Sequence, residues 1–273
     1  MCGCRFSIII PARNDAVALA RTLDRLARLP EINTAEIIVA AAGDPKGTVR
    51  AVACRARLLV CDDSTRADLM NAGAAAASGK ILFFLHADSV PPQDALRLIQ
   101  DVVADDRVVG GAFEHRFTER DWRLGIISGI NRLRYRLTRN YYGDQGIFVR
   151  AAVFRQLGGF PPRRLLEDLE FTRRLKRLGR SVLIRVPLAT SGRRFLGRGP
   201  WRTFAFIVWL LACYTLGFDT ERYAERWRGP AEQPPGSPWR PERLGRDGDG
   251  VEPPHRAMRR RDSASVAGAR ARR

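Results

Sequence analysis

The fold is decided by the stretch Gly79-Lys80-Ile81-Leu82-Phe83-Phe84-Leu85-His86-Ala87-Asp88-Ser89. It contains five apolar residues in a row, too few for a helix, which predict a strand buried on both faces of a sheet. The run stops at His86 and Asp88, and Pro91 and Pro92 block its continuation. Because ligands of open α/β sheets bind beyond the carboxyl ends of the strands, Asp88 is a candidate contact to a metal ion or another ligand.

Strands and helices alternate along most of the chain. Apolar runs predict further strands at residues 6–10, 36–40, 57–60, 108–113, 146–150 and 181–186, and helical spacing predicts helices at 16–29, 67–77, 93–104, 122–139 and 166–178. We expect Pro11 to close the first strand, residues 41–47 to form a loop, and Asp62, Asp63 or Ser64 to cap the helix at 67–77. This alternation predicts an α/β fold with a mostly parallel sheet flanked by helices.

The composition divides the chain into one expected domain, residues 1–228, and a tail. From residue 229 on, Pro, Gly, Arg and Asp dominate and apolar residues are few, so we expect 229–273 to be a disordered basic tail. The last part of the domain, residues 203–218, is its most apolar stretch. Its 16 residues fall short of the ~20 needed to span a bilayer. Three interpretations stay open: a helix packed on the domain, a contact with another subunit, or a membrane-interfacial helix.

Charge and cysteine content indicate the partners and the compartment. The chain has 47 Lys and Arg against 29 Asp and Glu, a net charge of +18, which favours nucleotides, phosphates, nucleic acid or an anionic membrane surface. The five cysteines are scattered, and no charged and then apolar leader precedes the first strand. We therefore expect reduced thiols and a cytoplasmic protein, with peripheral binding to the inner face of the cell membrane as a further candidate.

Polar groups follow several of the expected strands and helices. These groups are Asn14 and Asp15, the loop 41–44, Arg66 with Asn71, and His86 with Asp88. The carboxyl ends of parallel strands meet at one edge of a sheet, so these groups are expected to line one nucleotide-binding crevice. The sequence contains neither G-x-G-x-x-G after the first strand nor G-x-x-x-x-G-K-[ST], which argues against a dinucleotide fold and a P-loop.

Four motifs, in their order along the chain, resemble those of family 2 glycosyltransferases with the GT-A fold. The motifs are Ser7-Ile8-Ile9-Ile10-Pro11-Ala12-Arg13-Asn14-Asp15, Asn71-Ala72-Gly73-Ala74, Phe84-Leu85-His86-Ala87-Asp88 and Glu167-Asp168. The resemblance covers residues 5–225. A bacterial branch, named for arsenosugar biosynthesis or for association with radical-SAM and selenium-domain proteins, is similar at further motifs, and relatives are named as carotenoid-acid glucosyltransferases. These further motifs are Arg66 to Asn71, His86-Ala87-Asp88, Gly143-Asp144-Gln145-Gly146 and Ser191-Gly192-Arg193-Arg194.

The resemblance implies transfer of a sugar, with inversion, from a nucleotide-diphosphate donor, expected to be a UDP-sugar. Asp88 matches the second acid of the family's Asp-x-Asp metal motif, and His86 stands in place of the first. Carboxylates suit Mg²⁺, whereas an imidazole ligand shifts the preference towards Mn²⁺; the alternative for His86 is a hydrogen bond to the ribose or a loop. Of the Glu167-Asp168 pair, Asp168 is the expected general base and Glu167 the second candidate, the alternative being acids that stabilise a helix N-terminus.

The resemblance and the expected crevice together suggest a set of donor-binding residues: Pro11, Arg13, Asn14, Asp15, Asp44, Arg66, Asn71, His86, Ala87, Asp88, Asp144, Gln145, Arg193 and Arg194. Among them, Arg66, Arg193 and Arg194 are candidates for the diphosphate, with solvated surface charge as the alternative. Asp144 and Gln145 are expected near the donor sugar or the acceptor, with a simple turn as the alternative. The family usually has an acid at the end of the second strand, where this chain has Ala41, and Asp44 is the candidate substitute.

Two other functions fit the sequence less well. A sugar-phosphate nucleotidyltransferase carries a Gly-rich loop after the first strand, and residues 11–15 lack those glycines. A basic nucleic-acid-binding protein would not need carboxylates at strand ends, so we expect no nucleic-acid partner. The acceptor stays open between a small metabolite, a lipid and a carotenoid acid, through a hydroxyl or carboxyl group. The oligomeric state is not predicted.

Overall fold

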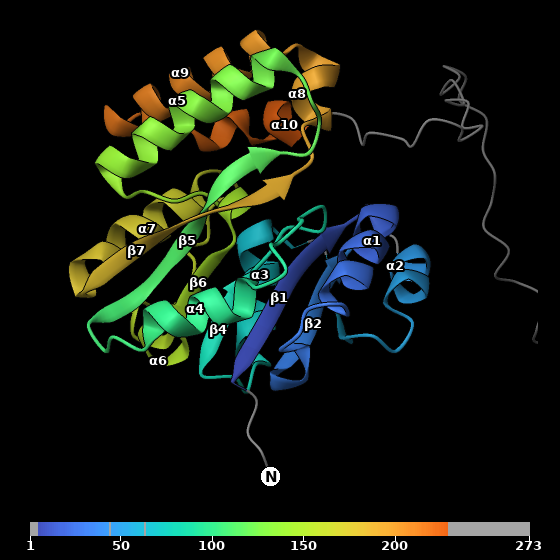
Figure 1. The fold of residues 1–273 in the computed structure, drawn as a ribbon. Helices are drawn as coiled ribbons and strands as arrows, with labels where there is room; N and C mark the ends of the chain where they lie inside the picture. The colour runs from blue at the N-terminus through green and yellow to red at the C-terminus, as the bar shows by residue number, and fades with distance from the viewer. Residues whose placement is uncertain (1–4, 44, 63, 229–273) are drawn as a thin grey trace, which may run out of the picture. The chain divides into compact units, whose positions relative to one another are not determined.

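The computed structural model describes residues 5–43, 45–62 and 64–228. Seven strands form one sheet in the order β3-β2-β1-β4-β6-β5-β7 (Figure 1). The strands are β1 (Phe6–Arg13), β2 (Ala35–Ala42), β3 (Arg57–Val60), β4 (Ile81–Phe84), β5 (Val108–Phe117), β6 (Ile147–Arg150) and β7 (Arg180–Thr190). The tail expected at 229–273 and the site candidate Asp44 lie outside the described residues.

Helices lie on both faces of the sheet and beyond one end of it. The α-helices are α1 (Ala16–Leu26), α2 (Pro45–Val52), α3 (Arg66–Ala75), α4 (Ala95–Val103), α5 (Trp122–Thr138), α6 (Ala151–Gln156), α7 (Glu167–Leu178), α8 (Arg193–Arg198), α9 (Pro200–Thr215) and α10 (Ala224–Arg228). Short 3₁₀ turns are η1 (Ile32–Thr34), η2 (Gly143–Gln145) and η3 (Glu221–Tyr223). Helices α1, α2 and α4 share one hydrophobic core with the sheet, and α3, α6 and α7 share another on the opposite face.

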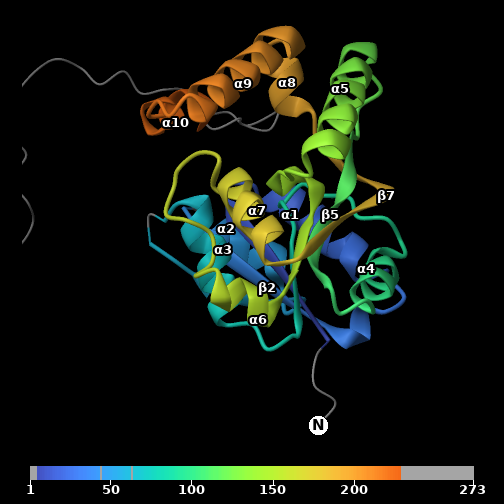
Figure 2. The same ribbon diagram turned by 90° about the vertical axis from the view of Figure 1, so that its left-hand side faces the viewer.

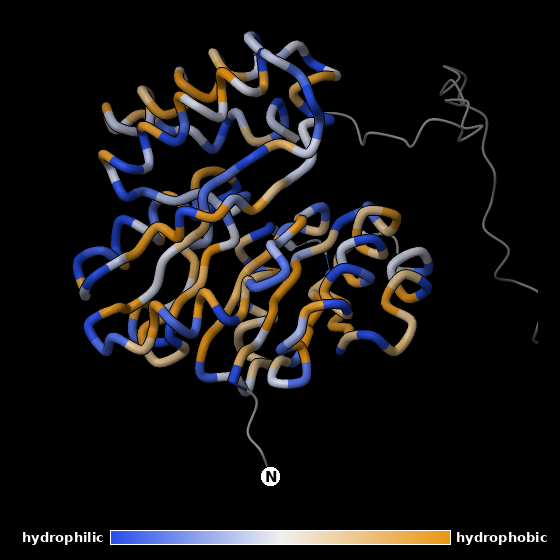
Figure 3. Tube along the Cα trace, in the orientation of Figure 1, coloured by the Kyte–Doolittle hydropathy of each residue, from blue (hydrophilic) through white to orange (hydrophobic). Residues whose placement is uncertain are grey.

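Strand β4 is buried on both faces, as the apolar run predicted. Phe83 packs into the core under α1 and α4, whereas Leu82 and Phe84 pack into the core under α3, α6 and α7. All three side chains are at most 2% exposed. Side chains of a strand alternate between the two faces of a sheet, so the uninterrupted apolar run is needed because both faces are covered. The strands stand out as apolar segments in Figure 3.

The sheet is mostly parallel, but β6 runs antiparallel to both of its neighbours, β4 and β5. A parallel strand after β5 would require a helix that crosses a face of the sheet. Helix α5 instead lies beyond the carboxyl ends of β1 and β5 and contacts α9 (Figure 1). The chain therefore re-enters the sheet from the edge at which it left, and β6 must run in the opposite direction. A helix still separates each pair of consecutive strands, as expected, and the single antiparallel strand agrees with a mostly parallel sheet.

Pro11 does not close the first strand, because β1 continues to Arg13. The carbonyl of Ile9 accepts a hydrogen bond from the amide of Leu85, so alternate backbone groups of β1, at Ile9 and Pro11, face β4. Strand β4 ends at Phe84, opposite Ile9. Pro11 lacks an amide hydrogen, but on the side of β1 where that hydrogen would point, β4 has already ended. No hydrogen bond of the sheet is therefore lost.

Other boundaries also differ from the sequence expectation. Helix α3 is capped by Thr65, in a capping box with Asp68, and not by residues 62–64. Strands β5 and β7 pair with each other as far as Phe117 and Thr190, well past the last residue that β5 pairs with β6. Helices α2, α6 and α8 are short and were not predicted.

The segment α8–α10 and helix α5 lie beyond the carboxyl end of the sheet (Figures 1 and 2). Helix α9 packs Leu210 against Leu165, two residues before α7, and Tyr214 donates a hydrogen bond to Glu170 in the first turn of α7. Most of the other apolar side chains of α9 are half-buried or exposed. Within the described part of the chain, no helix is long and apolar enough to cross a membrane.

Candidate active site

The loop after β4 is held in a defined shape at the carboxyl edge of the sheet. The hydroxyl of Thr22, on α1, donates to the carbonyl oxygens of Ala87 (2.7 Å) and Ser89 (3.1 Å). The buried Ser89 hydroxyl in turn accepts from the amide of His86. These contacts fix the backbone on both sides of Asp88, so the position of its carboxylate is set by α1 and not by a flexible loop.

Asp88 lies in a group of four charged side chains. Asp15 caps α1 through the amide of Ala18 and pairs with Arg193 at 2.8 Å. Burial and the neighbouring Asp15 raise the pKa of Asp88, while Arg193 and Arg194 act in the opposite direction. Residues from β1, β4 and α8, far apart in the sequence, therefore meet at one edge, as the strand-end pattern predicted for Asp15 and Asp88.

This group has the chemistry of a shared metal site. Mg²⁺ and Mn²⁺ are commonly held by one or two carboxylates together with oxygens of a bound phosphate. The raised pKa of Asp88 indicates a carboxylate whose charge the protein alone does not neutralise. Across the residues that the structure describes, no three His, Cys, Asp or Glu side chains form a ready-made metal cluster. The donors fit a divalent cation that the protein would hold jointly with a phosphate ligand.

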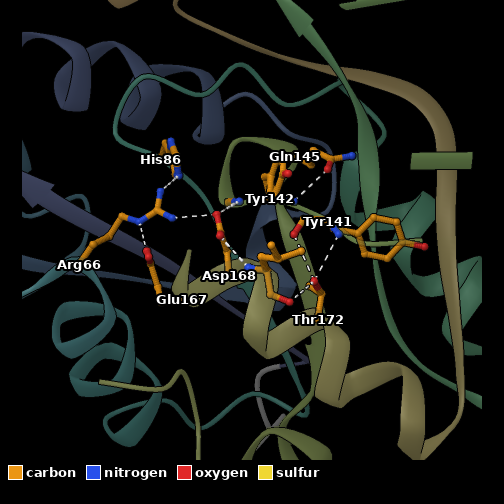
Figure 4. A network of polar contacts seen from close by, with 10 residues as sticks. Arg66, His86, Tyr141, Tyr142, Gln145, Glu167, Asp168 and Thr172 are labelled. Carbon is orange, nitrogen blue, oxygen red and sulfur yellow. Dashed lines mark hydrogen bonds and ion pairs between the residues drawn. The ribbon is translucent and has the colours of Figure 1, made fainter. Parts of the chain in front are cut away.

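A second group is centred on Arg66, the first residue of α3 (Figure 4). Its Nε donates to Glu167 Oε1 at 2.5 Å, and one terminal nitrogen donates to Asp168 Oδ2 at 2.9 Å. Burial lowers the pKa of Arg66, but the two carboxylates outweigh it and raise that pKa above its usual value. Burial also raises the pKa of Glu167; Arg66 opposes this, and Asp168 adds to it.

His86 is the third partner of Arg66, at 2.5 Å from the other terminal nitrogen to Nε2. A guanidinium can only donate, so Nε2 must accept and the ring is neutral with its proton on Nδ1. Burial and the nearby Arg66, Arg194 and His115 lower the pKa of His86 well below its usual value, in agreement with a neutral ring. The lone pair of Nε2 is therefore engaged by Arg66 and not free for a metal ion.

Asp168 is surrounded by donors at the start of α7. Oδ2 accepts from Arg66 and from the amide of Gly143 (2.7 Å), and Oδ1 accepts from the amide of Leu169 (2.7 Å). A carboxylate oxygen has two lone pairs, so Oδ2 is saturated and Oδ1 keeps one. The residue before the acids, Leu166, has φ of 60°, a conformation that costs energy for a bulky side chain and that marks functional sites.

The turn before β6 is attached to α7 next to these acids. Thr172 on α7 exchanges hydrogen bonds with the backbone of Tyr141, and Gly143 binds Asp168 (Figure 4). Gln145 is fully buried, and its amide joins the Tyr142 amide to a carbonyl of β5. Of the two interpretations given for Gln145, the simple turn agrees with these hydrogen bonds, because its side chain holds the turn together. Asp144 points elsewhere, with Oδ2 at 3.6 Å from Nε2 of His115.

The remaining candidates lie at the same edge with one exception. Asn14 adopts φ of 53° and packs against Gly43, where a Cβ would lie 2.3 Å from its Oδ1, and Arg13 donates to the carbonyl of Ser64. Ala41 is buried within β2, which extends to Ala42. Asn71 is not brought to the group: its amide makes two 2.9 Å hydrogen bonds to the backbone of Phe160.

Sequence reasoning missed three polar residues near the acids: His115 on β5, Arg134 on α5 and Tyr142 before η2. The expected strand ended at Phe113, which left His115 outside any element. The signal that was available is a histidine and a glutamate directly after an apolar strand. Nothing in the sequence connects Arg134 with this turn, because that contact depends on the position of α5.

The fold and the edge residues agree with a comparison of the sequence with known families. Residues 7–157, more than half of the chain, match the model of Glycosyl transferase family 2. The chain belongs to this family. A comparison of this chain with curated proteins found no match. The mixed sheet with its flanking helices is thereby the GT-A fold expected from the motifs.

Solved structures with a similar fold include the following three. The mannosyltransferase PcManGT from Pyrobaculum calidifontis, in complex with GDP-Man and Mn²⁺, is 20% identical with a TM-score of 0.58, covering 85% of this chain and 66% of that one. Glucosyl-3-phosphoglycerate synthase from Mycobacterium tuberculosis, in complex with Mn²⁺, UDP and glucosyl-3-phosphoglycerate, is 17% identical with a TM-score of 0.57, covering 80% and 81%. S. aureus TarS is 15% identical with a TM-score of 0.52, covering 68% and 36%.

Proposed function

We propose that this family 2 protein transfers a sugar from a nucleotide-diphosphate donor, a UDP-sugar, to a hydroxyl or carboxyl acceptor with inversion. The observation that carries the proposal is the juxtaposition of two groups at one sheet edge. Asp15, Asp88, Arg193 and Arg194 offer carboxylates and cations suited to a metal-bound diphosphate. The buried pair Glu167 and Asp168 offers a base, and His86 and Arg66 connect the two groups.

In the proposed reaction Asp168 is the general base. The acceptor oxygen bonds to the sugar carbon as the bond from that carbon to the diphosphate breaks, and the acceptor proton moves to Asp168. Only Oδ1 keeps a lone pair, so the proton is proposed to go there. Arg193 and Arg194 receive the charge that develops on the diphosphate, and a divalent cation bound with Asp88 would supply further electrophilic stabilisation.

The choice between Mg²⁺ and Mn²⁺ depends on His86. While Arg66 occupies Nε2, Asp88 is the proposed metal ligand and oxygen donors dominate, which suits either ion. His86 would join as a ligand only if Arg66 released that nitrogen. The similar structures with Mn²⁺ and UDP or GDP-Man support a nucleotide-bound divalent cation without deciding the nucleotide.

The test is donor binding and turnover by the purified protein with Mg²⁺ or Mn²⁺. Calorimetry with UDP-glucose and UDP measures binding, and release of UDP measures turnover. Asp168→Asn is expected to keep donor binding and to lose transfer, whereas Asp101→Asn, an exposed acid on α4, is expected to keep both. Full activity of Asp168→Asn would remove Asp168 from the base role, and a protein that binds no nucleotide sugar would refute the function.

We also propose that the protein is cytoplasmic and binds an anionic membrane surface through α5 and α9. Five apolar side chains of α5 are 45–74% exposed and recur at helical spacing: Trp122, Ile126, Ile130, Leu133 and Leu137. The ring of Trp122 lies 6.3 Å from that of Trp201, so this stripe adjoins α9 with its exposed Val208 and Trp209.

The positive charge of this surface favours anionic lipids as its binding partner. Arg132 and Arg136 are exposed on α5, where both pair with the one carboxylate of Glu114, and the exposed Arg139 follows the helix. An open hollow on α9 is lined by Arg202 and Arg226 beside aromatic rings. Anionic lipids complement these cations, whereas a second copy of the chain would present the same charge. A bound membrane would bring a lipid acceptor close to α7, and the carotenoid-acid relatives of the resembling branch suit such an acceptor.

Co-sedimentation with phosphatidylglycerol vesicles at low salt tests the surface. Leu133→Glu with Leu137→Glu is expected to abolish binding, while Val60→Glu, an equally exposed apolar position on β3, is expected to leave it unchanged. Retention of the wild-type protein in the supernatant would contradict the proposal. So would a dimer in solution that the α5 variant dissociates.

A further inference from the structure

A cluster of polar side chains, each with at least one buried polar atom, adjoins the acids on the side away from Asp15. It consists of His115 from β5, Arg134 from α5, and Tyr142 and Asp144 from the turn before β6. The side chain of His115 is 1% exposed, and its Nε2 contacts Thr190 Oγ1 at 2.8 Å and Asp144 Oδ2 at 3.6 Å. The guanidinium of Arg134 lies 4.0 Å from the centre of the Tyr142 ring.

Several polar atoms of this cluster are buried and lack a hydrogen-bond partner among the described residues: His115 Nδ1, Tyr142 Oη, Asp144 Oδ1, and Nε and Nη2 of Arg134. Leaving one such group unsatisfied costs about 1–3 kcal/mol, so most buried polar groups in proteins are paired. Four side chains with this deficit in one place do not contribute to folding through those atoms. Their grouping indicates a site that a polar ligand completes.

The strand order places the cluster relative to the rest of the crevice. Along the carboxyl edge, Asp15 follows β1 and Asp88 follows β4. Next in the sheet, Asp144 precedes β6, and His115 and Thr190 lie on β5 and β7. Asp168 is joined to this side through the Gly143 amide, one residue before Asp144. A ligand in the cluster would therefore lie next to the base and on the opposite side from the residues proposed for the nucleotide.

The chemistry of the cluster suits hydroxyl groups. Asp144 accepts, Arg134 donates, and Tyr142 and His115 can do either, with one positive charge from Arg134 against one negative charge from Asp144. A hydroxyl both donates and accepts and carries no charge. A phosphate would require a surplus of positive charge, which these four side chains lack. We propose that His115, Arg134, Tyr142 and Asp144 form a subsite that binds the hydroxyl groups of a sugar or polyol. The proposal rests on the proposed function, and its ligand comes either from the donor sugar or from a polyhydroxylated acceptor.

The unliganded protein offers a first test through thermal unfolding. Tyr142→Phe removes a hydroxyl that makes no hydrogen bond, so the Tm is expected to stay the same or rise. Tyr214→Phe removes a hydroxyl that donates to Glu170 and is expected to lower the Tm. A clear fall in the Tm of Tyr142→Phe would show that its hydroxyl is structural and would overturn the proposal.

Ligand binding then identifies the source of the hydroxyl groups. If the subsite holds the donor sugar, Tyr142→Phe and Asp144→Asn weaken UDP-glucose about tenfold in calorimetry and leave UDP unchanged, as expected for one lost hydrogen bond. If it holds the acceptor, both affinities stay unchanged and the variants lose the increase in UDP release that glycerol or glucose causes in the wild type. Unchanged affinities together with unchanged UDP release would overturn the subsite.

Failure of the proposed function is distinguishable from failure of the subsite. Binding of free glucose at millimolar concentration, followed by saturation-transfer NMR, does not depend on a nucleotide. Glucose that binds the wild type and not Asp144→Asn supports the subsite even if UDP-glucose does not bind. Glucose that binds neither protein, or both equally, together with unaltered UDP-glucose binding, counts against it.

Discussion

Replacement of Arg66 by Met is predicted to destabilise the protein in a pH-dependent way. Arg66 donates to Glu167 and Asp168, whose side chains are only 4% and 9% exposed. A hydrogen bond to a charged group contributes about 1.5–3 kcal/mol. Arg66 itself is 35% exposed, so the lower value applies to each bond, and the expected loss near pH 8 is about 3 kcal/mol.

The loss should shrink as the pH falls. The pKa of Glu167 is raised by burial even with Arg66 beside it, and it rises further when Arg66 is removed. Between the unfolded value of 4.5 and this raised value, the folded protein binds more protons than the unfolded chain, so stability decreases as pH rises through that window. As the pH falls through that window, Glu167 of the folded variant takes up a proton, and up to about half of the loss, about 1.5 kcal/mol, is recovered.

Urea unfolding followed by tryptophan fluorescence at pH 5 and pH 8 measures both values. Arg97→Met is the matched control, because its ion pairs with Asp94 and Asp101 join side chains that are 42–58% exposed. It is expected to lose less than about 1 kcal/mol at either pH. Equal losses for Arg66→Met at the two pH values, or a loss below about 1 kcal/mol at pH 8, would refute the view that buried Glu167 depends on Arg66.

Three further predictions concern stability and metal binding. Asn71→Ala removes both hydrogen bonds to the turn after α6 and should lower the free energy of urea unfolding by about 2 kcal/mol, with donor affinity unchanged. Weaker donor binding at unchanged stability would place Asn71 at the nucleotide instead. Gly111→Ala puts a Cβ 2.0 Å from the Val182 carbonyl oxygen and should destabilise the protein by about 1–3 kcal/mol. Gly125→Ala meets nothing within 4 Å and should stabilise α5 by up to about 1 kcal/mol. Equal Tm values for the two variants would contradict this. The pKa of Asp88 is raised, so acidification should weaken Mn²⁺-dependent UDP binding at a higher pH than it would with an ordinary aspartate ligand. Asp88→Asn should abolish the Mn²⁺ dependence of UDP binding. Identical pH profiles for variant and wild type would count against Asp88 as a ligand.

Local patterns predicted the central strands well. The bounds of β3, at 57–60, agree with the expectation, and β4 is one residue shorter than its apolar run. These strands could be predicted because the length of an apolar run, and the burial of both faces that it indicates, can be recognised from consecutive residues. The direction of β6 and the length of β5 were not predictable in this way. They depend on where α5 lies and on the long pairing of β5 with β7, which joins residues about seventy positions apart.

In the candidate site, too, some residues were indicated by the sequence, whereas the contacts of others were not predictable from it. Strand-end position alone indicated Asp15, His86 and Asp88, whereas the resemblance to the family indicated Glu167 and Asp168. Arg66 was expected at the diphosphate, yet its guanidinium binds acids 101 and 102 positions away. Asn71 was expected at the nucleotide, and its amide binds a backbone 89 positions away.

The sequence by itself determined that a strand buried on both faces ends at Asp88, because five consecutive apolar residues are stable only between two covering layers. It also determined the order of the polar motifs, and hence the family. Only the tertiary structure decided that Arg66 occupies Nε2 of His86, that Asp168 keeps one lone pair on Oδ1, and that His115 adjoins Asp144. The physical reason is that charge pairing and burial depend on distances in space, and these contacts join segments that the chain separates.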